Sequence, residues 1–153
     1  MDLFILEATV DGFKSGEVDL ETRMNQDPAQ GAFFIGTIID NIVDALRSPN
    51  AGAALSVSGH SDRDDNTARS HIEKLAVELQ AAEDRVSSAI DYIHTLVRQR
   101  EPSAPADLNS LSFFDVHLRA PGAAVLVADE VSLTESRRRL NRRVQARLLV
   151  YKP

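Results

Sequence analysis

The sequence ALSVSGHSD at residues 54–62 alternates small or polar side chains with apolar ones and then becomes polar. The two-residue period predicts a half-buried strand that ends near Ser58. Gly59 lets the backbone turn there or approach another segment closely. His60, Ser61 and Asp62 then present an imidazole, a hydroxyl and a carboxylate at the end of a rigid strand, a common place for a binding site. An ordinary exposed turn would have the same composition.

The composition is that of a globular protein. The chain has 153 residues, of which 43% are hydrophobic and 26% charged, so residues 1–153 are expected to form a single domain with its own core. No run of roughly 18 apolar residues is present to span a membrane. Residues 1–7 carry an acid where a secretory signal needs a basic flank. The absence of cysteine excludes disulfides and thiolate metal sites.

The segment before the quoted stretch predicts a strand and a helix. Residues 3–10 alternate apolar side chains with period two and predict a first strand. Residues 11–26 are polar without a clear period, and we interpret them as an irregular loop. Asp27 and Pro28 suit the N-cap and first position of a helix that Pro49 would follow. Its core-facing stripe would contain Phe34, Ile35, Ile38, Ile39, Ile42 and Leu46.

A long helix is predicted after the quoted stretch, over about residues 67–99. Its apolar positions alternate in steps of three and four, as in a heptad repeat: Ile72, Leu75, Leu79, Ala82, Val86 and Ile93. At 1.5 Å per residue the helix would be on the order of 40 Å long. That is more than a small domain needs. The whole apolar seam could lie on the sheet, or one end could project and contact a partner protein; we expect a mixture of the two.

The last third of the chain predicts further strands. Two prolines in residues 101–105 end the long helix. Alternation predicts a strand over residues 111–118, and a short apolar run over residues 123–127 could form another. Thr134 could cap a short helix over residues 134–140. Residues 143–151 alternate clearly and predict the final strand.

The order of these elements predicts the fold class. It reads strand, helix, strand, helix, strand, short helix, strand, a βαβαβ(α)β order. Each long helix has one apolar face, so both can cover the same side of a sheet. We therefore predict an α+β protein, a two-layer α/β sandwich with a mixed four-stranded sheet and the helices on one face.

The charge is distributed unevenly along the chain. The formal net charge is −6, yet no acidic residue follows Glu135. The basic residues beyond it are Arg137, Arg138, Arg139, Arg142, Arg143, Arg147 and Lys152. They could face an anionic polymer or the acidic part of the same fold. Nucleic acid is not expected as a partner, because the chain is acidic overall and this segment offers no aromatic platform beyond Tyr151.

Three segments resemble motifs of the OmpA-like domain family, which includes the C-terminal domain of outer-membrane protein A, peptidoglycan-associated lipoproteins and flagellar stator B subunits. GHSD at residues 59–62 is similar to the family's G-H-[TS]-D turn. RVSSAIDYI at residues 85–93 resembles its helix pattern R-A-x-x-V-x-x-Y-L. TESRRRLNRRV at residues 134–144 resembles T-x-E-G-R-x-x-N-R-R-V, with NRRV the most specific match. The order of elements agrees over nearly the whole chain.

The resemblance implies noncovalent binding of the peptidoglycan stem peptide at meso-diaminopimelate, by a module that anchors or targets a larger assembly to the cell wall. It implies neither enzymatic activity nor a cofactor. The family's binding pair falls on Asp62 and Arg85. Diaminopimelate ends in an ammonium, which a carboxylate can pair, and a carboxylate, which a guanidinium can bind with two hydrogen bonds. Further contacts at the same rim would come from His60, Ser61, Asn141 and Arg142.

The sequence departs from the family between the two residues of this pair. Arg85 follows Asp62 at a spacing about two helical turns longer than in the family. If those turns lie in the helix before Arg85, they would carry it about 12 Å from Asp62, at 1.5 Å per residue. Arg69 would then be the nearer cation. The family's glycine before the motif arginine is Arg137 here, and its final glutamate is Gln145.

Other chemistries have weaker support. His60, Asp62, Asp64, Asp65 and His71 could suggest a zinc or iron site. The sequence has no H-x-x-x-H helix, no G-x-S-x-G elbow and no glycine-rich phosphate loop. We therefore expect no metal, and neither a serine hydrolase nor a nucleotide-binding enzyme.

A second function also fits the sequence. The chain could be a structural or assembly protein of a multiprotein particle, of phage-tail or contractile-injection type, that uses the OmpA-like fold as a protein-interaction block without a ligand. The absence of a signal peptide would fit a component that folds in the cytoplasm and is delivered in a particle. It would equally fit a fragment of a periplasmic or cell-wall protein.

Overall fold

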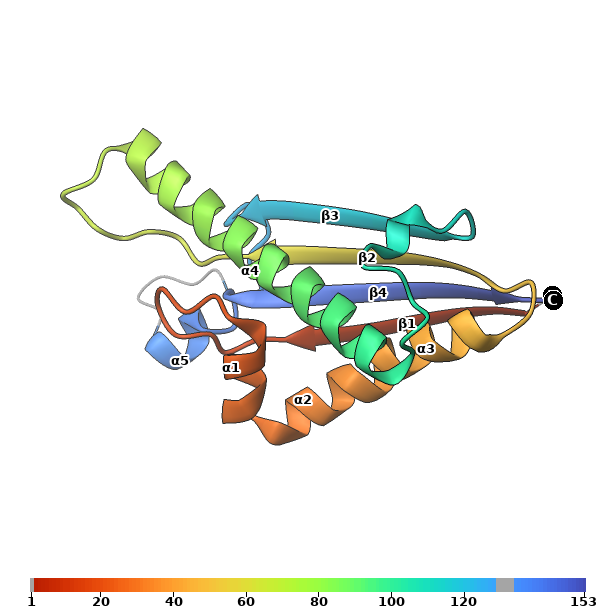
Figure 1. Cartoon of the computed structure of the whole chain (residues 1–153). Coiled ribbons are helices and arrows are strands. Elements are labelled where there is room, and N and C mark those ends of the chain that lie inside the picture. The colour runs from red at the N-terminus through yellow and green to blue at the C-terminus, as the bar shows by residue number, and fades with distance from the viewer. Residues whose placement is uncertain (1, 129–133) are drawn as a thin grey trace.

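A computed structural model describes residues 2–128 and 134–153. Four strands form one mixed sheet in the order β1-β4-β2-β3 (Figure 1). They are β1 (Asp2–Val10), β2 (Gly52–His60), β3 (Phe114–Gly122) and β4 (Arg143–Lys152). β4 is antiparallel to both β1 and β2, whereas β2 and β3 are parallel.

The strand alternation assigns one face of the sheet to the core. Leu6, Leu148 and Leu55 lie opposite one another across three strands, and Leu55 also pairs with Val116 of β3. One residue further along, Glu7, Arg147 and Ser56 form the equivalent row on the other face. Leu55 and Leu148 are fully buried and Leu6 and Val116 partly buried, whereas Glu7 and Arg147 are exposed, as the two-residue period requires.

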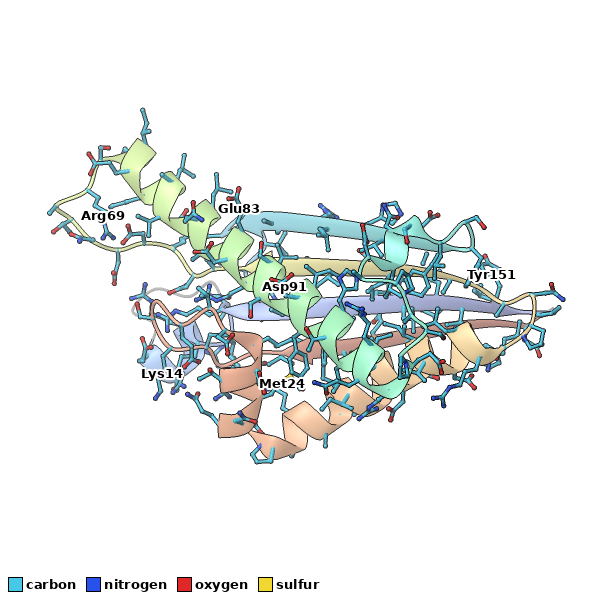
Figure 2. All side chains as sticks on the ribbon, viewed as in Figure 1. Lys14, Met24, Arg69, Glu83, Asp91 and Tyr151 are labelled. Atoms are coloured by element: carbon cyan, nitrogen blue, oxygen red, sulfur yellow. The ribbon has the colours of Figure 1, made fainter. Side chains whose placement is uncertain are left out.

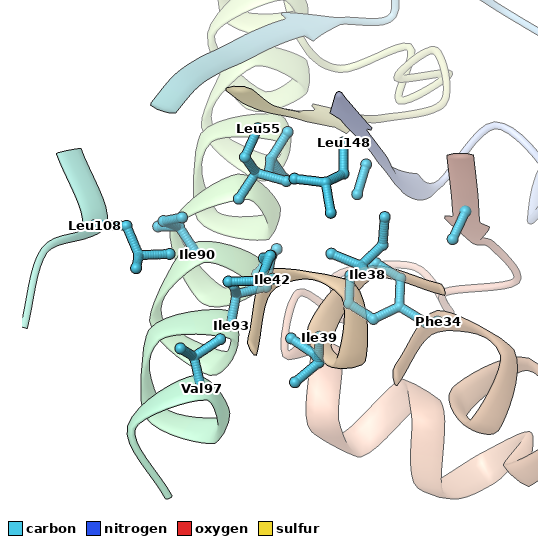
Figure 3. Packing of buried hydrophobic residues seen from close by; sticks show 14 of the residues in the cluster. Phe34, Ile38, Ile39, Ile42, Leu55, Ile90, Ile93, Val97, Leu108 and Leu148 are labelled. Carbon is cyan, nitrogen blue, oxygen red and sulfur yellow. The ribbon is translucent and has the colours of Figure 1, made fainter. Parts of the chain in front are cut away.

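The helices cover the apolar face. The first helix of this layer is continuous and consists of α2 (Pro28–Phe34), a π-helical segment (Ile35–Ile39) and α3 (Asp40–Arg47). It contacts β1 and β4, while α4 (His71–Arg100) lies over β2 and β3 (Figure 1). Phe34, Ile38, Ile42, Ile93 and Leu148 meet in the core between them (Figure 3). The predicted α+β class, with a mixed four-stranded sheet and its helices on one face, is confirmed.

Helix α4 is covered by the sheet along only part of its length. Its seam is buried from Ala82 to Val97, whereas Ile72 is 81% exposed and Leu75 is 57% exposed. The N-terminal turns extend beyond the end of the sheet (Figure 1), where Arg69 also lies (Figure 2). None of the described helices is long and apolar enough to cross a membrane.

Three boundaries in the N-terminal half differ from the sequence prediction. β2 does not end near Ser58 but continues to His60, because Gly59 and His60 still pair with Val144 and Arg143 of β4. Residues 11–26 are not irregular throughout, because Leu20–Gln26 form helix α1, capped by the Asp19 carboxylate, which accepts from the Thr22 N–H at 2.9 Å. Only Leu20 and Met24 are buried in this helix, too few for a period to be visible. Helix α4 begins at His71 rather than at residue 67, since Ser70 caps it by accepting from the Glu73 N–H.

The C-terminal half also differs in detail. β3 begins at Phe114, after a 3-10 turn at Leu108–Ser110, and continues to Gly122. The strand predicted over residues 123–127 is wrong. Side chains satisfy the backbone there, because Asn141 Oδ1 accepts from the Val127 N–H and Arg143 donates to the Val125 carbonyl. The final strand is confirmed, as is the short helix at Glu135–Arg138, named α5.

Candidate functional site

A cavity of about 380 Å³ lies where β2 ends, and it is called the rim cavity below. Its walls come from the segment after β2, from α4, from the loop after β1 and from the α5 region. Charged side chains of both signs line it: Asp62, Asp64, Asp65, Glu78, Glu135, Arg63, Arg69, Arg85, Arg138 and Arg142. The balance of the two signs suits a zwitterionic ligand better than a simple anion or cation.

The segment after β2 is held against α4 by its own polar groups. The Ser61 hydroxyl donates to the Glu78 carbonyl at 2.8 Å, and the Asp64 N–H donates to the Glu78 carboxylate at 2.8 Å. The Ser61 N–H also donates to the Gly122 carbonyl at the end of β3. The position of Asp62 is therefore set by α4 and by β3 together.

The Asp62 carboxylate is buried and has several donors around it. Asn141 donates to Oδ1 at 2.9 Å, and Arg138 Nε donates to Oδ2 at 2.5 Å. Arg142 Nη2 lies 3.9 Å from the same Oδ2. The two donors and Arg142 all belong to the segment that precedes β4, so the residues of the third motif converge on the aspartate of the first.

Arg138 joins three groups of the segment after β2. Besides Asp62, it donates to the Asp65 carboxylate at 2.5 Å and to the Arg63 carbonyl at 2.9 Å. Burial disfavours the charged form of Arg138, but its hydrogen bonds to Asp62 and Asp65 outweigh this and raise its pKa. The hydrogen bond from Arg138 lowers the pKa of Asp65. Arg138 thus occupies the outer oxygen of Asp62, where a ligand cation would have to bind.

Arg85 is the deepest cation of the cavity wall, with only 1% of its surface exposed. Its Nε and Nη2 donate to the Glu17 carbonyl at 3.0 and 2.8 Å, and Nη1 donates to the His60 carbonyl at 2.9 Å. Its guanidinium carbon also lies 5.3 Å from the centre of the Phe13 ring. Burial, together with the charge of Arg142, lowers the pKa of Arg85 to about 10, so it remains charged at neutral pH.

Arg142 lies between the two ends of the cavity. It donates to the Glu135 carboxylate at 2.6 Å and to the Phe13 carbonyl at 3.4 Å. The hydrogen bond from Arg142 lowers the pKa of Glu135, which is largely exposed. Because Arg142 also approaches Asp62, it places a positive charge beside the carboxylate without enclosing it.

The structure brings four of the six predicted site residues to the cavity wall, namely Ser61, Asp62, Arg85 and Arg142. Asn141 is fully buried behind Asp62, where it also accepts from two N–H groups and donates to the Ala128 carbonyl. His60 is buried beside the cavity, and its Nε2 lies 2.8 Å from the Ser58 hydroxyl oxygen. Ligand contact by these six residues stays a prediction.

The longer spacing between Asp62 and Arg85 does not separate Arg85 from the end of β2 and the segment that follows it. Arg85 reaches the carbonyl of His60 and lines the same cavity as Asp62. The additional residues instead form the projecting turns of α4 and the loop that leads to them (Figure 1). Arg69 pairs with Asp64 at 2.7 Å at the outer end of the cavity.

Sequence reasoning missed Arg138 as a residue of this site. It lies within the third motif, three positions before Asn141, so the motif was the available signal. The sequence suggests Asp64 and Asp65 only as possible metal ligands, whereas in the structure they pair with Arg69 and Arg138. Among residues 2–128 and 134–153, no group of three or more histidine, aspartate or glutamate side chains is arranged to hold a metal ion.

The buried His60 makes the stability of the fold depend on pH. Burial, together with Arg143 and Arg119, lowers the pKa of His60 from 6.5 to about 4. The unfolded chain therefore binds more protons between these values, and stability falls as the pH falls. We expect a loss of about 2 kcal/mol in the free energy of unfolding between pH 7 and pH 5, measured by urea denaturation.

The matched variant for this measurement is His60→Gln. It should keep only the smaller loss that other groups contribute, including His94, whose pKa burial also lowers. Parallel pH curves for the two proteins would show that His60 is not the group responsible.

Comparisons with known proteins concern the fold. No protein-family model matches the chain, and no curated protein matches it. Solved structures that it resembles include the OmpA-like domain of FopA1 from Francisella tularensis, with 13% identity, 97% of this chain and 74% of that chain covered, and a TM-score of 0.45. The cell wall anchor of the T6SS from Pseudomonas aeruginosa shows 20% identity, coverage of 97% and 82%, and a TM-score of 0.45. The periplasmic domain of Helicobacter pylori MotB shows 16% identity, coverage of 94% and 80%, and the same TM-score.

Proposed function

We propose that the chain is a binding module that holds peptidoglycan noncovalently at the meso-diaminopimelate of the stem peptide, and so anchors a larger assembly to the cell wall. The observation that carries this proposal is the rim cavity itself. Asp62, Arg85 and Arg142 come from three separate segments, and all three line it. A cavity with a fixed carboxylate and fixed guanidinium groups suits a ligand that carries an ammonium and a carboxylate on one carbon.

The roles follow from the contacts. Asp62 receives the ligand ammonium, and Arg142 with Arg85 supplies the positive charge for the ligand carboxylate. Asn141 holds the Asp62 carboxylate in place from behind through Oδ1, so the ligand ammonium would bind at Oδ2. His60 and Ser61 support the turn, because the His60 carbonyl binds Arg85 and the Ser61 hydroxyl binds α4.

Binding requires an exchange at Oδ2 of Asp62, where Arg138 lies in this structure. The ligand ammonium and the Arg138 guanidinium are both cations, so the exchange replaces one charge-assisted hydrogen bond by another. Arg138 is partly exposed and sits on a helix of only four residues, so it can turn away more readily than the buried Arg85. Arg138 would then face the solvent together with Asp65.

The test is retention of the purified chain on isolated sacculi that contain meso-diaminopimelate. Asp62→Asn should reduce retention at least about tenfold, because an amide cannot pair an ammonium as a carboxylate does. Arg138→Gln should increase retention, because the competing cation is gone. Free meso-diaminopimelate in excess should release the wild-type protein.

Asp115→Asn is the matched control, since Asp115 is an exposed residue of β3 outside the cavity. It should bind as the wild type does, and far-UV circular dichroism should show that every variant is folded. Equal retention of Asp62→Asn and Asp115→Asn would refute the proposal. If the wild type is not retained, the projecting turns of α4, with Ile72 and Leu75 exposed, favour the second function, a protein-interaction block.

A further inference from the structure

The two edges of the sheet are protected to different degrees. β3 forms one edge and contains His117, Arg119 and Pro121, and its pairing with β2 is irregular between Ser58 and His60. Charged residues, proline and such irregularities are devices that prevent a sheet edge from pairing with another strand. β1 forms the other edge, and its nine residues contain no lysine, arginine, glycine or proline.

β1 is regular, and three consecutive apolar residues of this strand are exposed. It pairs with β4 without interruption from Asp2 to Val10, and among the described strands it pairs with β4 alone (Figure 1). Leu3 is 47% exposed, Phe4 43% and Ile5 52%. These three residues lie on both faces of the sheet, so the exposed surface wraps around the edge. An unpaired regular edge with apolar side chains is a template for another strand.

The neighbours of β1 enlarge this surface. Leu3 and Ile5 lie opposite Tyr151 and Leu149 of β4 on the face that none of the described helices covers, and Tyr151 is also exposed. On the helix face, a cavity of about 100 Å³ lies beside Phe4 and Leu6, bounded by Asn41, Asp44, Val150 and Lys152. An apolar side chain of a partner strand could enter this cavity, as anchor residues do at protein interfaces.

We propose that β1 is a self-association surface and that two copies of this chain pair antiparallel through it about a two-fold axis at Phe4. In that register Leu3 faces Ile5 of the second copy, and the two Phe4 residues face each other. Each exposed apolar residue of the edge thus meets another. The interaction is isologous, so one surface has only to match itself. It does not involve the rim cavity and stands independently of the proposed ligand.

The charges of β1 are compatible with self-pairing. Its two acids are Asp2 and Glu7, which lie on opposite faces of the sheet because one position is even and the other odd. Residues that face each other across the two-fold axis lie on the same face, so Asp2 never opposes Glu7. Glu7 is in addition paired with Arg147 at 3.1 Å. In the register centred on Phe4, Asp2 faces Leu6, and like charges do not meet.

Sedimentation velocity over a range of concentrations tests this surface. The wild-type chain should show a monomer–dimer equilibrium. Ile5→Lys should raise the dissociation constant at least about tenfold, because each dimer would bring two lysines into apolar contact. Leu118→Lys is the matched control, since Leu118 is 49% exposed on the other edge strand and should leave the equilibrium unchanged. A wild-type chain that stays monomeric, or an equal effect of the two substitutions, would overturn the proposal.

A cysteine cross-link gives a second measurement that does not depend on the lysine variant. The chain contains no cysteine, so Phe4→Cys and Leu118→Cys each introduce a single thiol. Facing residues of an antiparallel pair have Cα atoms about 4.5 to 5.5 Å apart, within the range of a disulfide. Under mild oxidation Phe4→Cys should form a disulfide-linked dimer and Leu118→Cys should not. Equal cross-linking of the two variants would contradict pairing at β1.

Discussion

Replacing Gly59 with alanine is expected to lower the free energy of unfolding by about 3 kcal/mol or more. A Cβ atom at this position would lie 2.1 Å from the Ala82 carbonyl oxygen and 2.8 Å from the Val86 nitrogen. Both contacts are with the backbone of α4, so no side chain can rotate to make room. The whole helix would have to move away from β2. Urea denaturation followed by circular dichroism measures the loss.

Gly36→Ala is the matched control for this substitution. Gly36 lies in the π-helical segment Ile35–Ile39, and apart from its chain neighbours and the backbone of its own helix no described heavy atom would come within 4 Å of its added Cβ. Alanine there should be neutral or should stabilise by about 0.5 kcal/mol, because it restricts the unfolded chain. If Gly59→Ala costs no more than Gly36→Ala, then α4 can shift freely, and the close contact does not set its position.

Replacing Arg85 with methionine is expected to lower the free energy of unfolding by about 3 kcal/mol. Methionine keeps much of the length of the side chain but removes three hydrogen bonds to the Glu17 and His60 carbonyls. The carbonyl of His60 is buried and would lose its guanidinium partner. The loop after β1, which Arg85 ties to α4, should exchange its amide hydrogens faster. Urea denaturation and hydrogen exchange of residues 11–19 measure the two effects.

Arg69→Met provides the comparison for Arg85. Arg69 is partly exposed and pairs with Asp64 at 2.7 Å. A surface ion pair contributes about 1 kcal/mol or less, so this variant should be nearly as stable as the wild type. Similar losses for the two variants would mean that the buried contacts of Arg85 contribute no more than an exposed ion pair.

These two positions also link the fold to the rim cavity. Gly59 brings α4 close to β2, and this contact lets Arg85 reach the His60 carbonyl. Arg85 in turn fixes the Glu17 end of the loop that forms another wall of the cavity. A partly folded Gly59→Ala variant should therefore also lose the geometry at Asp62.

The elements of the fold were largely predictable from local pattern. β2 up to Ser58 and β4 alternate clearly, and the helix that follows Asp27 has both a cap and an apolar stripe, so each signal lies within one segment. Helix α1 was missed because seven residues with two buried positions leave no readable period. The strand expected at residues 123–127 was wrong because an apolar run does not reveal that Asn141 and Arg143 bind its backbone.

The candidate site was predictable only in part. The motif residues Asp62, Arg85 and Arg142 line one cavity, but the sequence assigned no role to Arg138. Arg138 and Asp62 are separated by 76 positions, and no local spacing relates them. The consequence of the longer spacing before Arg85 could not be predicted either. The sequence does not show whether the added helical turns lie over the sheet, where they would displace Arg85, or beyond the end of the sheet, where they would not.

The sequence alone determined most of the strands and helices, which of their faces are apolar, and that polar residues lie at and after the end of β2, because each depends on neighbours a few positions away. The tertiary structure decided what those polar groups bind. Arg138 donates a hydrogen bond to Asp62, and Arg85 donates three hydrogen bonds to the carbonyls of Glu17 and His60. The added turns of α4 lie beyond the end of the sheet (Figure 1). The tertiary structure also left β1 as the less protected edge. These outcomes depend on distances between segments far apart in the chain, and only the packing of α4 and β4 against β2 sets those distances.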